Sequence, residues 1–286
     1  MTTRSLAQII QSMATADGAG VKLRRSLGSQ RGVHVDPFLM LDEFFSDNPD
    51  DYLAGFPDHP HRGFETVTYM LDGRMRHRDN HGNEGLLVPG SVQWMTAGRG
   101  LVHSEMPEQQ QGRMRGFQLW LNLPAREKMT APKYQEFGPE RIPTASPANG
   151  VAVKVIAGRV AEVTGPISQP ATDPTYLDVS LEPGATFVQA LPAGHAAFLY
   201  VFEGAMEVGA DASASVVRTQ ELAVLGEGAE IRLKGASTGA DGRSAARAIL
   251  VAGRPLREPV ARYGPFVMNT RAELQQAFAD FQSGRL

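Results

Sequence analysis

The chain has 286 residues, of which 42% are hydrophobic, and its formal net charge is −3. This length suits two domains of ordinary size. The chain contains no cysteine, which excludes disulfide bonds, thiol chemistry and a closed zinc site of the thiolate type. The slightly acidic balance provides no basic surface for direct nucleic-acid binding. No apolar run is long enough for a signal peptide or a membrane span, so we expect a cytoplasmic protein without membrane contact.

The first elements in chain order are predicted to be strands. Residues 21–27 alternate apolar and polar side chains, which is the period of a half-buried strand. Three basic residues in this run are expected to form an ordinary solvated strand face rather than a binding patch: Lys22, Arg24 and Arg25. An apolar run at 38–41 then leads into an acidic loop at 46–52.

Two pairs of ligand-type side chains follow. His59 and His61 lie two residues apart, so their imidazoles point to the same face of a strand. His103 and Glu105 repeat this spacing with an imidazole and a carboxylate. An antiparallel sheet that brings the two pairs together would make four ligands converge on one divalent metal. On an octahedral ion, two positions would stay open for a substrate or dioxygen.

The residue types leave alternatives open at this site. A single His-x-His pair also occurs where the histidines are only exposed or hydrogen-bonded, and the second pair is what favours a metal. Glu65 is a rival ligand, because it shares strand parity with His59 and His61. Imidazoles combined with a carboxylate favour iron or manganese, but nickel, copper and zinc also accept such ligands.

The segment after Glu65 predicts a further strand, since it is rich in β-branched residues. Continuing the same parity places Val67 and Tyr69 on the ligand face. His77 and His81 have no ligand-type partner two residues away, and both are expected to be exposed.

Another alternating run at residues 117–123 predicts a strand that carries Phe117 and Trp120. These aromatic side chains form either a flat apolar pocket for an aromatic substrate or part of a barrel core. Pro, Gly and Ser then concentrate between residues 137 and 150, which predicts a linker. We therefore expect a metal-binding domain at residues 1–137 and a second domain at residues 138–286.

The second half of the chain resembles a decayed copy of the first. Residues 199–206 echo residues 68–75, and short strands separated by turn signals predict an antiparallel barrel or sandwich. A small polar run at 236–244 predicts a hairpin tip. When residues 199–206 are aligned with residues 68–75, the positions of His59, His61 and Glu65 correspond to Ala190, Pro192 and Ala196. None of these three residues can bind a metal.

The carboxyl-terminal segment predicts an α-helix over residues 271–283. Thr270 and Glu273 have the spacing of a capping box. Apolar residues recur at helical spacing from Leu274 to Phe281, and Gly284 provides a stop. We expect this stripe to pack onto a barrel wall.

Five motifs give the chain a resemblance to the pirin family, a two-domain branch of the cupins. They are DPFLMLDEF (36–44), HPHRGFETVTY (59–69), PGSVQWMTAGRGLVHSEMP (89–107), GFQLWLNLP (116–124) and YGPFVMNT (263–270). The resemblance implies an all-β bicupin, with two antiparallel β-barrel or jelly-roll domains and a C-terminal α-helix. It also implies that Fe²⁺ is held by His59, His61, His103 and Glu105, with Glu65, the general cupin ligand, ranked second.

The resemblance implies two functions. The first is a flavonol dioxygenase of the quercetin 2,3-dioxygenase type, which opens the flavonol ring with dioxygen and releases carbon monoxide. Glu105 or Glu65 would take the hydroxyl proton of the substrate. The second is a metal-dependent binding protein without turnover, a transcriptional co-regulator or a modulator of a metabolic enzyme. We expect a monomer, because a bicupin already pairs two barrels in one chain.

Overall fold

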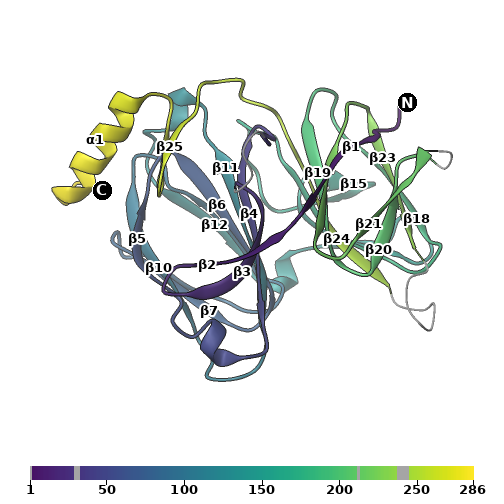
Figure 1. Ribbon diagram of the computed structural model, residues 1–286, viewed down its shortest axis with the longest axis horizontal. Coiled ribbons are helices and arrows are strands. Elements are labelled where there is room, and N and C mark those ends of the chain that lie inside the picture. Colours follow the sequence, from purple (N-terminus) through teal and green to yellow (C-terminus); the bar gives the residue numbers. More distant parts are fainter. Residues whose placement is uncertain (1, 29–32, 211–212, 237–244) are drawn as a thin grey trace. The chain divides into compact units, whose positions relative to one another are not determined.

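The computed structural model describes residues 2–28, 33–210, 213–236 and 245–286 (Figure 1). These residues are mostly in antiparallel strands, and one α-helix among them, α1 (Arg271–Gln282), lies near the carboxyl terminus. The predicted all-β fold with a terminal helix is confirmed. The hairpin tip predicted at 236–244 lies, except for Ala236, outside the described residues.

Two compact units are interleaved along the chain. The amino-terminal unit contains residues 13–34, 38–139 and 256–286, and the carboxyl-terminal unit contains residues 1–12, 35–37 and 140–255. Each end of the chain therefore packs into the unit formed mainly by the other half. The expected domains, 1–137 and 138–286, follow chain order and do not include this exchange.

A seven-stranded and a four-stranded antiparallel sheet form the amino-terminal unit. The larger sheet has the order β12 (Lys133–Phe137), β9 (Val92–Thr96), β6 (Phe64–Asp72), β11 (Met114–Asn122), β4 (Phe38–Ser46), β3 (Val21–Leu27), β2 (Met13–Asp17). The smaller sheet has the order β5 (Phe56–His61), β10 (Leu101–Pro107), β7 (Met75–Asp79), β8 (Glu84–Leu87). A hairpin of β25 (Ala261–Tyr263) and β26 (Phe266–Met268) completes this unit.

The carboxyl-terminal unit repeats this seven-plus-four arrangement. Its larger sheet has the order β1 (Leu6–Gln11), β22 (Glu221–Leu225), β19 (Ala196–Glu203), β24 (Ala246–Gly253), β17 (Thr175–Leu181), β14 (Val151–Ala157), β13 (Thr144–Ala145). Its smaller sheet has the order β18 (Thr186–Ala190), β23 (Glu230–Gly235), β20 (Ala205–Val208), β21 (Ser215–Arg218), and β15 (Arg159–Val160) pairs separately with β16 (Val163–Thr164).

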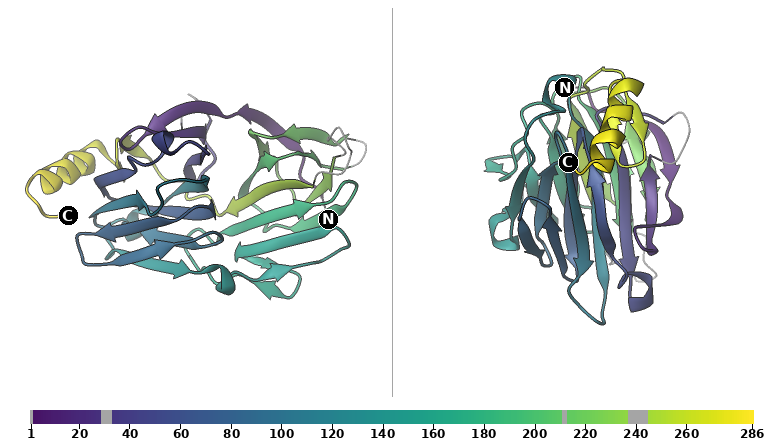
Figure 2. Two further views of the ribbon diagram at one scale, coloured as in Figure 1. Left: turned by 90° about the horizontal axis from the view of Figure 1, so that it is seen from below. Right: turned by 90° about the vertical axis from the view of Figure 1, so that its left-hand side faces the viewer.

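Strands β19 and β20 occupy the places in their unit that β6 and β7 occupy in the other, in agreement with the sequence echo. Each unit is built of layered strands (Figure 2). The interior of the carboxyl-terminal unit is filled by a continuous apolar cluster, which includes Val155, Leu177, Leu199, Met206 and Leu233. Buried aliphatic side chains of this kind stabilise the unit by about 25 cal/mol per Å² removed from water.

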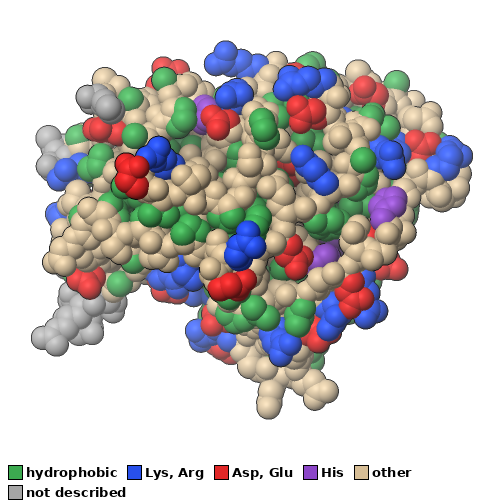
Figure 3. Space-filling view, turned by 180° about the vertical axis from the view of Figure 1, so that it is seen from behind, with side chains coloured by type: hydrophobic (Ala, Val, Ile, Leu, Met, Phe, Trp, Pro, Cys, Tyr) green, Lys and Arg blue, Asp and Glu red, His purple; other side chains and the backbone are tan. Residues whose placement is uncertain are grey.

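Among the described residues, no helix is long and apolar enough to cross a membrane. On the molecular face in Figure 3, Lys and Arg side chains are interspersed with Asp and Glu. A face of mixed sign does not produce the continuous positive potential that attracts a phosphate backbone.

Helix α1 lies beside β25 at one side of the amino-terminal unit (Figure 1). Thr270 and Glu273 form the predicted capping box at its start. Leu274 and Ala277 are buried in a cluster with residues of β26. Arg62 then fixes the helix to the loop after β5, because its guanidinium lies 2.7 Å from the Asp280 carboxylate.

A buried lysine fastens the carboxyl-terminal segment to the same unit. The Nζ atom of Lys128 donates to the carbonyls of Gly63 (2.7 Å) and Val267 (2.9 Å) and to Oδ1 of Asn122 (2.6 Å). One ammonium group therefore joins the loop before β6, the end of β11 and the tail, so the tail is part of the fold of the amino-terminal unit.

Replacing this lysine tests the fastening. Lys128→Met keeps the length of the side chain but leaves three buried oxygens without their donor, and each costs about 1–3 kcal/mol. We expect the free energy of unfolding, measured by urea denaturation, to fall by about 2–4 kcal/mol. Lys133→Met, at an exposed position of β12, is the control and should change it by less than about 0.5 kcal/mol.

Candidate metal centre

The pairing of β5 with β10 brings the histidines together. His103 lies directly opposite His59 in this antiparallel pair, and His61 follows on the same face of β5. The ring centroids are 4.4 Å apart for His59 and His103, 4.7 Å for His59 and His61, and 5.0 Å for His61 and His103. One nitrogen of each ring lies within 4.8 Å of one nitrogen of the other two. Within the described part of the chain, this is the one cluster that has the geometry of a metal site.

The hydrogen bonding of the rings fits a metal. His103 is completely buried, and neither of its ring nitrogens has a hydrogen-bond partner; Nδ1 of His61 is also buried without one. An unsatisfied buried polar group costs about 1–3 kcal/mol, so such groups are rare unless another ligand uses them. A divalent cation bound among the three rings would use one nitrogen of each ring, and so would satisfy one of the two nitrogens of His103.

The protonation of the rings also suits metal binding. Burial, followed by the neighbouring imidazoles, holds the pKa of His61 and of His103 well below its ordinary value. Both rings are therefore neutral near pH 7, which is the form that binds a metal. Nδ1 of His59 lies 2.8 Å from the carbonyl of Pro57. Donation to that carbonyl fixes the tautomer and leaves Nε2 of His59 as the atom that would bind a metal.

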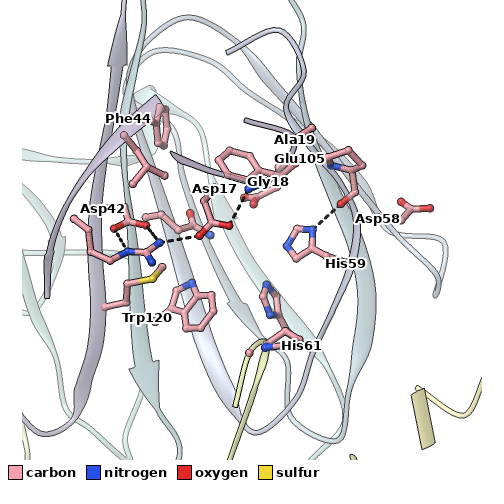
Figure 4. Close-up of a pocket in the computed structure, with 18 of the residues that line it drawn as sticks. Asp17, Gly18, Ala19, Asp42, Phe44, Asp58, His59, His61, Glu105 and Trp120 are labelled. Carbon is pink, nitrogen blue, oxygen red and sulfur yellow. Dashed lines mark hydrogen bonds and ion pairs between the residues drawn. The ribbon is translucent and has the colours of Figure 1, made fainter. Parts of the chain in front are cut away.

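Glu105 lines the same cavity as His59 and His61 (Figure 4). A register shift between His103 and Glu105 places Glu105 opposite Phe56 of β5. Its Oε1 accepts a hydrogen bond from the hydroxyl of Thr68 (3.0 Å), and it is not part of the compact three-histidine group. Its predicted role as the fourth ligand stays a prediction.

Glu65 lies on the opposite face of β6 from the cavity. Residues directly opposite each other in a sheet share a face, and Glu65 is paired with Leu121, whereas the cavity-lining Trp120 is paired with Thr66. Glu65 is fully buried, and its Oε1 accepts a hydrogen bond of 2.6 Å from Thr96. The rank of Glu65 as a second ligand or base stays a prediction.

The placement of Val67 and Tyr69 on the ligand face was wrong. Strand β5 ends at His61, and β6 begins at Phe64 after a break at Arg62 and Gly63. The parity counted from the histidines is therefore not continued into β6. The cavity face of β6 carries Thr66 and Thr68, which lie opposite Trp120 and Gln118 of β11.

The expected exposure of His77 was also wrong, whereas His81 is exposed as predicted. His77 is buried opposite Glu105 on the β7–β10 pair, and its Nε2 lies 2.7 Å from a carboxylate oxygen of Glu136. Its ring stacks on Tyr134 at 5.4 Å. The sequence signal that could have indicated burial is the alternation of Met75 and His77 with the charged residues of β7.

A cavity of about 590 Å³ adjoins the histidines, and its lining comes from β2, β3, β4, β5, β7, β10, β11 and the β25–β26 hairpin. Trp120 forms an aromatic wall, with its ring centroid 5.2 Å from that of His61 (Figure 4). Arg25 is part of the lining and was wrongly expected on a solvated strand face. Its guanidinium pairs with Asp42 (2.7 Å) and Asp17 (2.8 Å).

Metal addition tests the site. Zn²⁺, a redox-inert probe, should stabilise the metal-free protein by RT ln(1 + [L]/Kd), about 2.7 kcal/mol at a hundredfold excess over Kd. His103→Ala should abolish this stabilisation in thermal unfolding, whereas His81→Ala, at an exposed position outside the group, should retain it. Equal stabilisation of wild type and His103→Ala would contradict the site.

Comparisons with known proteins agree with this fold and site. Residues 20–121 match the family described as Pirin, and residues 176–286 match the Pirin C-terminal cupin domain. A pirin-like protein of Caulobacter vibrioides is 52% identical over the full length of both chains. Human pirin is 42% identical, over 96% of this chain and 91% of its own. A crystal structure of quercetin 2,3-dioxygenase from Acinetobacter baumannii superposes with a TM-score of 0.88 at 33% identity, covering 99% of this chain and 98% of the other. The chain therefore belongs to the pirin family, and its two units are the two cupin domains of a bicupin.

Proposed function

We propose that this bicupin is a mononuclear iron dioxygenase that acts on a flavonol of the quercetin type. The observation that carries the proposal is the compact group of three imidazoles, two of which, those of His59 and His61, line a cavity of about 590 Å³. This volume lies in the range of small-molecule sites. The similarity to the Acinetobacter baumannii quercetin 2,3-dioxygenase supports the choice of substrate class.

Iron bound by the histidines, with Glu105 as the proposed fourth ligand, would supply a Lewis acid for the substrate's deprotonated hydroxyl and a one-electron couple for reaction with dioxygen. The protein's own residues would orient the substrate and exclude water. Trp120 offers a flat apolar surface next to His61, and Phe64 packs against the indole at 4.4 Å and holds it in place. An aromatic substrate would therefore lie edge-on to the metal site.

Glu105 is the better placed of the two carboxylates to receive the hydroxyl proton. It lines the cavity, whereas Glu65 lies on the other face of β6. The Thr68 hydroxyl has a single proton and lies 3.0 Å from Glu105 Oε1 and 2.7 Å from Gln118 Oε1. It can donate to one of them at a time, so a shift of this bond would accompany protonation of Glu105.

Turnover tests the activity. Iron-loaded protein mixed with quercetin under air should consume the flavonol absorbance, and His59→Ala should reduce the rate at least a hundredfold by removing a ligand. His81→Ala is the matched control and should match wild type. A wild-type rate no higher than that of His59→Ala would contradict the enzyme and favour the metal-dependent binding role.

The general base can be tested separately. Glu105→Gln removes the proton acceptor and should lower kcat by roughly 10²–10⁴-fold. Glu108→Gln, at an exposed position just after β10, should leave kcat unchanged. Iron content measured on the same samples separates loss of the base from loss of a ligand. A Glu105→Gln enzyme with full iron and full kcat would assign proton transfer to another group.

A further inference from the structure

An arginine from the carboxyl-terminal segment contacts the aromatic wall of the cavity. Arg262, in β25, places its guanidinium carbon 4.9 Å from the centroid of the Trp120 ring. The other ring contact of this indole within the cavity is His61, at 5.2 Å. The same indole therefore contacts both a guanidinium and one of the proposed metal ligands.

The two arginines that line the cavity differ in how their charges are balanced. Arg25 is held by both oxygens of Asp42 and by Asp17. Arg262 donates to the carbonyl of Leu39 at 3.1 Å and contacts the sulfur of Met40 at 4.0 Å. Within the described part of the chain, no carboxylate forms an ion pair with Arg262. The guanidinium of Arg262 is therefore held by a carbonyl and a sulfur, which are neutral groups.

Arg262 lines the cavity and is also exposed to solvent. Partial burial, and then the charge of Arg25, lower the pKa of Arg262, while the carboxylates of Asp42 and Asp17 act in the opposite direction; the guanidinium stays protonated. An anion that enters the cavity would therefore find a positive charge with no bound carboxylate among the described residues. It would also find a planar fork of donors, which suits two oxygens of one group.

We propose that Arg262 and Trp120 form a subsite for an anionic oxygen group on an aromatic substrate, in the cavity that His59 and His61 also line. This inference rests on the proposed function and specifies the substrate class further. The aromatic rings pack along Trp120 while one end faces the metal ligands. The other end carries a phenolate, carboxylate or sulfonate that pairs with Arg262.

A purely structural role for Arg262 makes a different prediction. The bond to Leu39 fastens the β25–β26 hairpin to the start of β4, so a structural arginine would affect stability and would not discriminate between ligands. The measurement that separates the two roles is therefore the preference between a charged and a neutral ligand, compared within each variant.

The test uses zinc-loaded full-length protein, kept free of dioxygen so that no turnover occurs, titrated with a flavonol and with the same flavonol carrying an aryl sulfonate. Quenching of tryptophan fluorescence reports binding, because Trp120 lines the cavity. Wild type should bind the sulfonate about three- to tenfold more tightly, the range of a partly exposed charge-assisted hydrogen bond. Arg262→Gln should lose this preference and Arg262→Lys should keep part of it.

Arg126→Gln is the matched control. It removes the same charge from an exposed position of the amino-terminal unit that is not part of the cavity lining, so it should keep the wild-type preference. An equal preference in Arg262→Gln and wild type would overturn the subsite, as would equal affinity of wild type for both ligands or saturable binding of neither. If the preference holds but the iron-loaded enzyme does not consume flavonols, the dioxygenase proposal fails and the subsite stands.

Discussion

The burial of His103 with both ring nitrogens unpaired is the constraint on which the site depends. Its imidazole lies in the interior of a sheet sandwich, where each unsatisfied nitrogen costs free energy that a phenylalanine or leucine would not. The carboxyl-terminal unit, built with the same arrangement of strands, has an apolar interior instead. The polar interior of one unit is therefore a feature of its ligand chemistry and not of the cupin fold.

The strand register places the histidines next to a cavity. His59 and His103 face each other on the smaller sheet, while the opposing wall is built by Trp120 and its neighbours on the larger sheet. The carboxyl-terminal hairpin then adds Arg262, and Lys128 joins the same segment to the loop before β6 and to the end of β11. Residues far apart in the chain thus complete one site, and the tail contributes to its lining as well as to its stability.

The fold and the histidines could be predicted from sequence for a simple physical reason. Side chains two residues apart in a strand share a face, so the spacing of His59 and His61 is enough to place their imidazoles side by side. The same rule failed for Val67 and Tyr69, because Gly63 has a φ of 88° and interrupts the extended chain between β5 and β6. Local parity also could not show that Arg25 faces the buried Asp42, or that residue 262 packs on Trp120, since tertiary pairing determines both contacts.

X-ray absorption spectroscopy at the iron edge tests the central claim most directly, because it reports which side chains surround the ion. Three histidines bound to one iron predict outer-shell scattering from three imidazole rings, in addition to oxygen ligands. The spectrum of His103→Ala should lose one ring. An iron site with fewer than two imidazoles in the wild-type protein, or a spectrum unchanged by His103→Ala, would contradict the account.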